Sequence, residues 1–126
     1  MRIAYRLWLD AGGRAFGEGP AALLDLVRTE GSLSKAASHL GMSYNKAWHT
    51  LHAAEQRLGF PLLERQIGGE HGGGSRLSAE GDELLRRFQA LKADVERDLG
   101  KLYEKHFADW PPPPHRGDGD SGSPRA

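Results

Sequence analysis

The sequence contains no cysteine, no long apolar run and no excess of charge of either sign. Without cysteine the chain can form no disulfide, no thiolate metal site and no cysteine nucleophile, which agrees with a reducing compartment. No apolar stretch approaches the roughly 18 residues that a membrane-spanning helix needs, and the N-terminus lacks the apolar segment of a secretion signal. We therefore expect a soluble, cytoplasmic protein without a membrane partner.

The charged residues, 17 basic and 17 acidic, cancel. Because there is no overall basic excess, any surface that binds nucleic acid must be a local patch. The first 60 residues hold seven Lys and Arg against five Asp and Glu, a net charge of +2, and are the better place for such a patch. A chain of 126 residues, 38% of them apolar, is expected to form one domain with one modest core.

Hydrophobic spacing at the start of the chain predicts a short strand pair followed by a helix. Alternation over residues 2–10 places four apolar residues on one face of a strand: Ile3, Tyr5, Leu7 and Leu9. Gly12 and Gly13 then predict a turn, and residues 14–17 a short return strand. Pro20 suits the first turn of a helix, which Gly31 ends.

Two further helices, separated by a glycine, predict a helix-turn-helix. Residues 32–41 form the first, a short capped helix whose Ala36 and Ala37 are small enough for close helix contact. Gly41 permits the left-handed backbone of a tight turn. The second helix covers residues 43–58 with Ser43 as its cap, Gly59 as its end and a core face of Ala47, Leu51, Ala54 and Leu58. In this motif the second helix enters the major groove of DNA.

A glycine-tipped strand pair and a long helix complete the pattern. Strand candidates at residues 62–65 and 75–78 flank a loop, residues 68–74, in which five of seven residues are glycine. A strand pair directly after a helix pair is the order of a winged helix. Residues 79–107 predict a long helix with an apolar stripe at nearly heptad spacing, which we expect to pair two copies: Leu84, Phe88, Leu91, Val95, Leu99 and Leu102.

This pattern divides the chain into three parts. Residues 1–78 are expected to form a winged helix-turn-helix DNA-binding domain that includes the N-terminal strand pair. Residues 79–107 form a linker and dimerisation helix. Residues 108–126, rich in Pro, Gly and Asp, have little apolar content and are expected to be disordered.

The second helix of the pair carries a polar outer face if its apolar positions face the core. That face presents donors and acceptors suited to base edges and phosphates: Asn45, Lys46, His49, His52 and Gln56. The alternative is an ordinary amphipathic hairpin with a solvated polar face. Trp48 borders the core stripe and the outer face, so structural packing is the favoured role and a contact with DNA the alternative.

Several stretches resemble a known family. Residues 31–37 (Gly-Ser-Leu-Ser-Lys-Ala-Ala) and 40–48 (Leu-Gly-Met-Ser-Tyr-Asn-Lys-Ala-Trp) are similar to the helix-turn-helix of the ModE-type molybdate-responsive repressors, distant kin of LysR-type regulators. Residues 63–65, the glycine-rich stretch 68–78 and Gly81 resemble that family's wing and the start of its linker helix. The resemblance covers roughly residues 1–107 and implies a dimeric winged-helix transcription regulator.

Full-length members of that family continue into a second domain of small β-barrels that binds molybdate or tungstate. After Phe107 the only large apolar residue is Trp110, so we expect no such domain and no cofactor in this sequence. Oxyanion sensing would then belong to a separate protein or to a full-length homologue that acts as a partner.

The expected DNA contacts come from the start of the first helix of the pair, the second helix and the wing. Ser34 and Lys35 lie where phosphate contacts are common in this motif, although a plain cap and a solvated lysine are the alternatives. The full set is Ser34, Lys35, Ser43, Tyr44, Asn45, Lys46, Trp48, His49, His52, Arg65, His71 and Arg76.

Other chemistries find little support in the sequence. His49, His52 and Glu55 are spaced so that the outer two lie about 120° apart around a helix, which disfavours a metal site. Residues 68–74 lack the Gly-Lys-Ser/Thr ending of a phosphate-binding loop. No ordered Ser/His/Asp set or buried carboxylate pair indicates catalysis, so we do not expect an enzyme.

The sequence therefore predicts a mostly α protein with a small β wing and a long C-terminal dimerisation helix. The predicted function is a sequence-specific DNA-binding transcription regulator that acts as a homodimer on double-stranded DNA. The competing hypothesis is an interaction protein that uses the same fold to pair with a full-length regulator or another partner and has little DNA affinity of its own.

Overall fold

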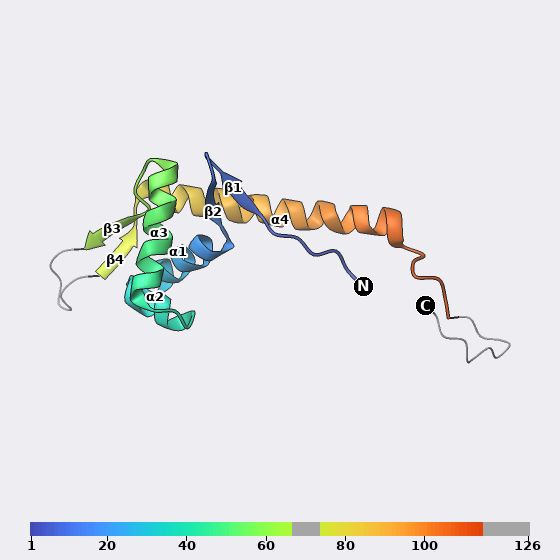
Figure 1. The fold of residues 1–126 in the computed structure, drawn as a ribbon, viewed down its shortest axis with the longest axis horizontal. Coiled ribbons are helices and arrows are strands. Elements are labelled where there is room, and N and C mark those ends of the chain that lie inside the picture. Colours follow the sequence, from blue (N-terminus) through green and yellow to red (C-terminus); the bar gives the residue numbers. More distant parts are fainter. Residues whose placement is uncertain (67–73, 115–126) are drawn as a thin grey trace.

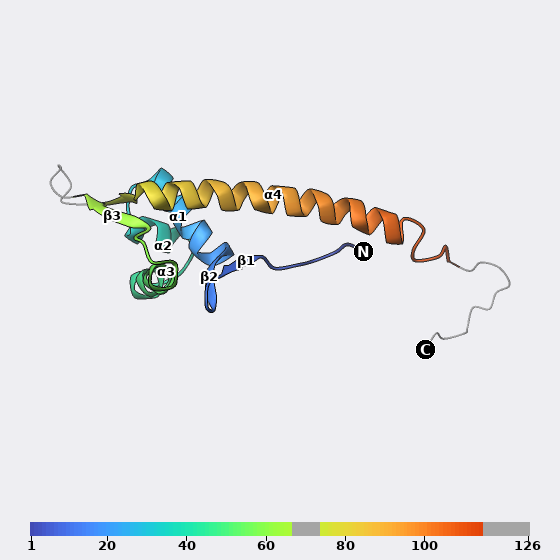
Figure 2. The same cartoon turned by 90° about the horizontal axis from the view of Figure 1, so that it is seen from above.

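The computed structural model describes residues 1–66 and 74–114. The elements follow in the order β1 (Trp8–Asp10), β2 (Arg14–Gly17), α1 (Glu18–Glu30), α2 (Leu33–His39), α3 (Tyr44–Leu58), β3 (Leu63–Gln66), β4 (Gly74–Leu77) and α4 (Ala79–Phe107). The first three helices and both strand pairs gather around the first turns of α4, and the rest of α4 extends away from this body (Figures 1 and 2).

The N-terminal strand pair is shorter than the alternation predicted. β1 pairs antiparallel with β2, and Leu9 lies opposite Phe16. Residues 1–7 are not in the ladder, because β2 has only four residues and offers them no partner. They run beside α4 instead (Figures 1 and 2). The Tyr103 hydroxyl donates a hydrogen bond to the Met1 carbonyl at 2.9 Å. The alternation itself holds from Tyr5 onwards, whereas Ile3 is exposed.

Three helices begin with the same serine cap. The Oγ atoms of Ser32, Ser43 and Ser78 accept hydrogen bonds from the backbone N–H groups three residues on, at 3.1, 3.1 and 2.8 Å. Each bond satisfies one of the donors that a helix N-terminus leaves unpaired. The turn between α2 and α3 passes through Gly41 at φ 69°, as the helix-turn-helix prediction requires.

The core lies where α1 meets α2, α3, β2 and the first turns of α4. Its fully buried large side chains include Phe16, Leu23, Leu24, Val27, Leu62, Leu85 and Phe88. The rings of Phe16 and Phe88 meet edge to face with their centroids 5.2 Å apart, a favoured aromatic geometry. The first turns of α4 are therefore part of the folded body and not only a linker.

The wing follows α3 as predicted, shifted by one residue at each strand. β3 pairs antiparallel with β4, with Glu64 opposite Arg76 and Arg65 opposite Ser75. The Ser75 N–H donates to the Gly31 carbonyl at 3.1 Å, which ties β4 to the turn between α1 and α2. The glycine-rich tip, residues 67–73, and most of the predicted tail, residues 115–126, lie outside the described residues. No helix in the described ranges is long and apolar enough to cross a membrane.

Candidate nucleic-acid interface

Helix α3 is fixed to the body by one face and leaves the opposite face uncovered. Ala47, Leu51 and Ala54 are buried in the core. At 100° per residue, the side chains of Asn45, His49 and Gln56 lie on the side of the helix opposite them, and all three are exposed. The sequence predicted this division correctly, because the apolar spacing of α3 is that of an amphipathic helix.

The N-terminal half of α3 concentrates the polar groups that sequence reasoning selected. Ser43 caps the helix, and its Oγ is engaged with the Lys46 backbone N–H. Tyr44, Asn45 and Lys46 are exposed in the first turn. Within the described residues the Lys46 ammonium forms no ion pair, so its charge is available to an incoming anion. The positive end of the helix dipole adds to this charge.

Helix α2 contributes a smaller part of the same surface. Ser34 and Lys35 are both exposed at its start. The cap is Ser32 and not Ser34, since the Ser32 Oγ accepts the Lys35 N–H at 3.1 Å. The alternative reading of Ser34 as a plain cap is therefore wrong, and its hydroxyl points to no described partner.

Trp48 packs against neighbouring rings on the surface and is not part of the buried core. Its side chain is 42% exposed, because its position on α3 is about 90° from the buried stripe. The His52 ring stacks on it, with centroids 4.5 Å apart and planes 16° from parallel. The His49 ring meets it edge-on at 5.1 Å. Three predicted contact residues thus form one aromatic cluster on the surface.

Glu55 links this cluster to the root of the wing. One of its carboxylate oxygens accepts the Leu62 N–H at 2.7 Å, and the other lies 3.8 Å from the His52 Nδ1. Sequence reasoning considered Glu55 only as a metal ligand. Its role as the acceptor for a backbone N–H after the helix has no sequence signal, since that partner lies seven residues away.

The wing presents two exposed arginines, of which one is in an ion pair within the described residues and the other is not. Arg65 on β3 is exposed, and within the described residues it forms no ion pair. Arg76 on β4 is also exposed, but its Nε lies 3.2 Å from the Glu64 Oε1 across the ladder. The predicted contact residue His71 belongs to the wing tip, outside the described residues. Arg65 is therefore the more available cation of the two.

The predicted stripe on α4 divides into a covered part and an open part. Phe88 is 2% exposed and Leu84 packs against the core, so these two serve their own chain and the expectation of an open stripe is wrong for them. Sequence reasoning missed Leu85, which is fully buried beside them. Beyond the body, Leu91 and Leu102 are 39% and 49% exposed, while Val95 and Leu99 are half-buried.

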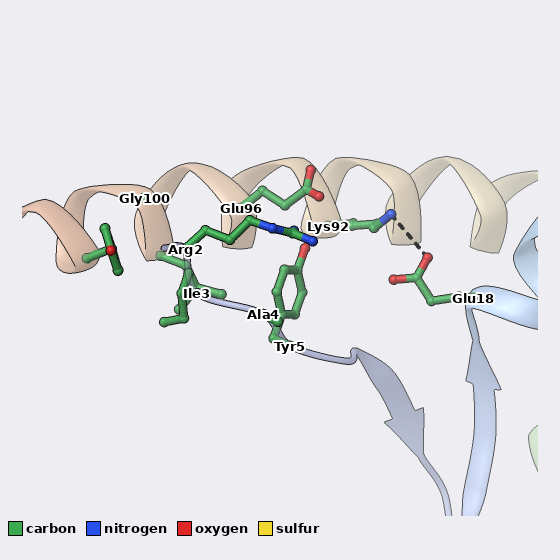
Figure 3. A pocket seen from close by; sticks show the side chains of 10 residues that line it. Arg2, Ile3, Ala4, Tyr5, Glu18, Lys92, Glu96 and Gly100 are labelled. Atoms are coloured by element: carbon green, nitrogen blue, oxygen red, sulfur yellow. Dashed lines mark ion pairs between the residues drawn. The ribbon is translucent and has the colours of Figure 1, made fainter. Parts of the chain in front are cut away.

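A hollow of about 420 Å³ lies between the N-terminal segment and α4. Tyr5 points from that segment towards α4 near Lys92 and Glu96, and Lys92 faces Glu18 from the start of α1 (Figure 3). The Lys92 ammonium lies 3.1 Å from the Glu18 carboxylate, whose hydrogen bond and charge raise the pKa of Lys92. Burial raises the pKa of Tyr5, and the Glu96 carboxylate adds to the effect. These pairings are between residues distant in sequence and had no local signal.

The sequence matches known bacterial regulators. Residues 21–82 match the family described as bacterial regulatory helix-turn-helix protein, lysR family. The chain is 30% identical over 105 residues to the molybdenum transport protein ModE of Azotobacter vinelandii. That alignment covers 82% of this chain and 39% of ModE. The chain is 34% identical over 101 residues to the molybdenum-pterin-binding protein MopB of Rhodobacter capsulatus, covering 80% and 37%. The chain thus spans about two fifths of the length of these relatives.

Solved structures share the fold. The DNA-binding domain of CbnR, determined in complex with DNA, aligns with a TM-score of 0.56 and 23% identity over 71% of this chain and 99% of that chain. ArgP from Mycobacterium tuberculosis aligns with a TM-score of 0.50 and 26% identity over 71% of this chain and 30% of that one. The aligned fold is the winged helix, as the sequence predicted.

Proposed function

The chain carries a helix-turn-helix domain of the bacterial LysR-type regulatory family, and from this premise we propose that it is a sequence-specific, DNA-binding transcription regulator. The observation that carries the proposal is the uncovered outer face of α3. A helix anchored by Ala47, Leu51 and Ala54, with Asn45, Lys46 and His49 exposed, has the shape and donor groups that the major groove accepts. CbnR, which shares the fold, was solved with DNA bound to its DNA-binding domain.

The remaining contacts would come from α2 and the wing. With α3 in the major groove, exposed Ser34 and Lys35 are placed to meet the phosphate backbone. Arg65, and the wing tip with His71, would reach the backbone or the adjacent minor groove. The overall charge of zero means that this local set must supply the electrostatic part of binding.

We further propose that two copies pair through α4. A 29-residue helix is about 43 Å long, and only its first turns contact the body (Figure 1). The open stripe of Leu91, Val95, Leu99 and Leu102 leaves apolar surface that a second α4 would cover. A two-fold dimer would place two α3 helices on one side of the DNA, about 34 Å apart.

The competing hypothesis is an interaction protein that pairs with a full-length regulator or another partner through the same winged-helix fold and has little DNA affinity of its own. The zero net charge favours it. The uncovered polar face of α3 disfavours it, because a protein that only pairs with another protein does not need a face of donors and acceptors suited to DNA.

A selection experiment tests the proposal. Purified protein is mixed with fragmented genomic DNA, retained fragments are sequenced, and affinity for the best fragment is measured by fluorescence anisotropy at two salt concentrations. We expect enrichment of a common sequence by the wild type. The double variant Lys46→Ala/His49→Ala should weaken binding by about tenfold or more, since a base contact is worth about 1–3 kcal/mol.

The control for this pair is Lys101→Ala, which removes an exposed lysine from the far part of α4. It should bind like the wild type. All variants should melt at the wild-type temperature, because none of the three side chains is in the core. Binding unaffected by the double variant, or no enrichment by the wild type, contradicts the proposal.

A further inference from the structure

The exposed indole of Trp48 has a defined orientation although no core residue holds it. The ring lies on the flank of α3 that faces the wing and is 42% exposed. An exposed tryptophan would ordinarily sample several rotamers, and fixing one costs conformational entropy. Here the ring is flanked by the His52 imidazole in parallel stacking and the His49 imidazole edge-on.

The His52 ring is held in turn by the link to the wing. Glu55 is fixed by its bond to the Leu62 N–H and places its second oxygen 3.8 Å from the His52 Nδ1. A chain of contacts from Leu62 to Glu55, from Glu55 to His52 and from His52 to Trp48 therefore connects the residue before β3 to the indole. The charged groups around the hollow beside this stack, about 180 Å³ in volume, are Glu55 from α3 and Glu64 and Arg65 from β3.

We propose that His52 is a positioning residue whose ring, by stacking, fixes the Trp48 indole for an apolar contact with DNA. This inference rests on the proposed function and adds a specific contact to it. A flat apolar ring on the flank of a helix in the major groove meets either a thymine methyl group or a deoxyribose. In this account the flat ring of His52, and not its capacity to carry charge, is what matters for affinity.

Three replacements of His52 separate stacking from charge. His52→Phe keeps a flat ring without charge, His52→Lys keeps a cation without a ring, and His52→Ala removes both. An aromatic pair is worth about 0.5–1.5 kcal/mol, so His52→Ala and His52→Lys should bind the selected DNA about three- to tenfold more weakly than the wild type. His52→Phe should bind within about twofold of the wild type.

A double-mutant cycle on His52 and Trp48 shows whether these two residues act together in DNA binding. Trp48→Ala should weaken binding, and adding His52→Ala to it should cause no further loss. Near-ultraviolet circular dichroism of Trp48, in a background with Trp8→Phe and Trp110→Phe, reports the stack without DNA. We expect the signal to persist in His52→Phe and to fall in His52→Ala and His52→Lys, with melting temperatures unchanged.

Replacing thymidine with deoxyuridine in the selected DNA shows which DNA group, a thymine methyl or a deoxyribose, contacts the Trp48 indole. A loss of about fourfold, the value of one buried methyl group, that is seen with the wild type and absent with Trp48→Ala identifies the methyl. No loss at any thymine identifies the deoxyribose.

Two results would overturn the inference alone. One is full affinity in His52→Lys together with loss in His52→Phe, which would make His52 a phosphate contact. The other is full affinity in Trp48→Ala while Lys46→Ala/His49→Ala is impaired. A wild type that enriches no DNA fragment overturns the proposed function and this inference with it.

Discussion

Ser78 is the one buried polar residue among the described residues. It is fully buried, its Oγ accepts the Gly81 N–H at 2.8 Å and donates to the Pro61 carbonyl at 2.6 Å. Its own N–H donates to the Leu62 carbonyl at 2.9 Å. One serine thus caps α4 and fixes the root of the wing to it.

We predict that Ser78→Ala lowers the free energy of unfolding by about 2–3 kcal/mol. Loss of the cap costs about 1 kcal/mol, and the part-buried Pro61 carbonyl loses its donor. Ser32→Ala is the matched control, since Ser32 makes only a cap bond, and should cost about 1 kcal/mol. Urea unfolding measures both, and equal losses in the two variants would contradict the assigned second role.

Gly81, three residues on, has a steric role. A Cβ there would lie 2.3 Å from the Leu62 carbonyl oxygen, a distance that requires the backbone to move. We predict that Gly81→Ala is destabilising despite the higher helix propensity of alanine. Gly100→Ala on the same helix has open space and should be stabilising by up to about 1 kcal/mol. Thermal melting of both variants checks the sign of each change.

Tyr5 supplies a prediction about pH. Burial and the Glu96 carboxylate raise the pKa of Tyr5 in the folded chain. The phenol therefore holds its proton more tightly in the folded chain than in the unfolded chain. That contribution to stability is present below the ordinary tyrosine pKa and is lost as pH rises through the raised one. Absorbance titration should find the highest tyrosine pKa missing in Tyr5→Phe and retained in Tyr44→Phe.

At the scale of elements, the wing offers a comparison of two arginines on neighbouring strands. Arg76 is already paired with Glu64, whereas Arg65 has no ion-pair partner in the described part of the chain. An anion must compete with Glu64 for Arg76, but not for Arg65. The wing therefore favours a phosphate contact through β3.

We predict that Arg65→Ala reduces the slope of log affinity against log salt by about one, the effect of one lost phosphate contact. Arg76→Ala should reduce it by less. Anisotropy titrations over a series of salt concentrations give both slopes. A larger effect for Arg76→Ala would show that the Glu64 pair opens on binding and would contradict this assignment.

Helices, caps and the wing were predictable because their signals are local. Ser43, Gly41 and Gly59 mark helix boundaries by rules that act within a few residues of chain. The environment of residues at the edge of a buried helix face was not predictable from the sequence, because it depends on which elements pack beside that edge. Trp48 lies about 90° from the buried stripe, where the apolar spacing of the helix predicts neither burial nor exposure, and it is 42% exposed. For the same reason the α4 stripe was read without Leu85.

At the scale of the whole molecule, the proposed pairing through α4 would set the arrangement of two DNA-binding units. The part beyond the body has no described cover over Leu91 and Leu102. Beyond the body α4 extends as a single helix (Figure 2), and a single copy presents the side chains of Leu91 and Leu102 to water. The proposed pairing would cover this surface and would set the spacing of the two units.

We predict that Leu91→Asp/Val95→Asp yields a monomer in sedimentation experiments and loses tight binding to the selected DNA. Two charges placed on the open stripe must be buried in any pair of α4 helices. Ala90→Asp/Ala93→Asp places the same charges on exposed positions away from the stripe and should remain dimeric. A monomeric wild type at micromolar concentration would contradict pairing through α4.

The most direct test of the account is a hydroxyl-radical footprint on the selected DNA. Two copies that each insert one α3 should protect two patches on the same face of the duplex, about 10 base pairs apart from centre to centre. The two patches should be equal in strength and should disappear together in Lys46→Ala/His49→Ala. A single protected patch, or protection without any preferred sequence, would contradict the proposal that this chain reads DNA as a symmetric pair.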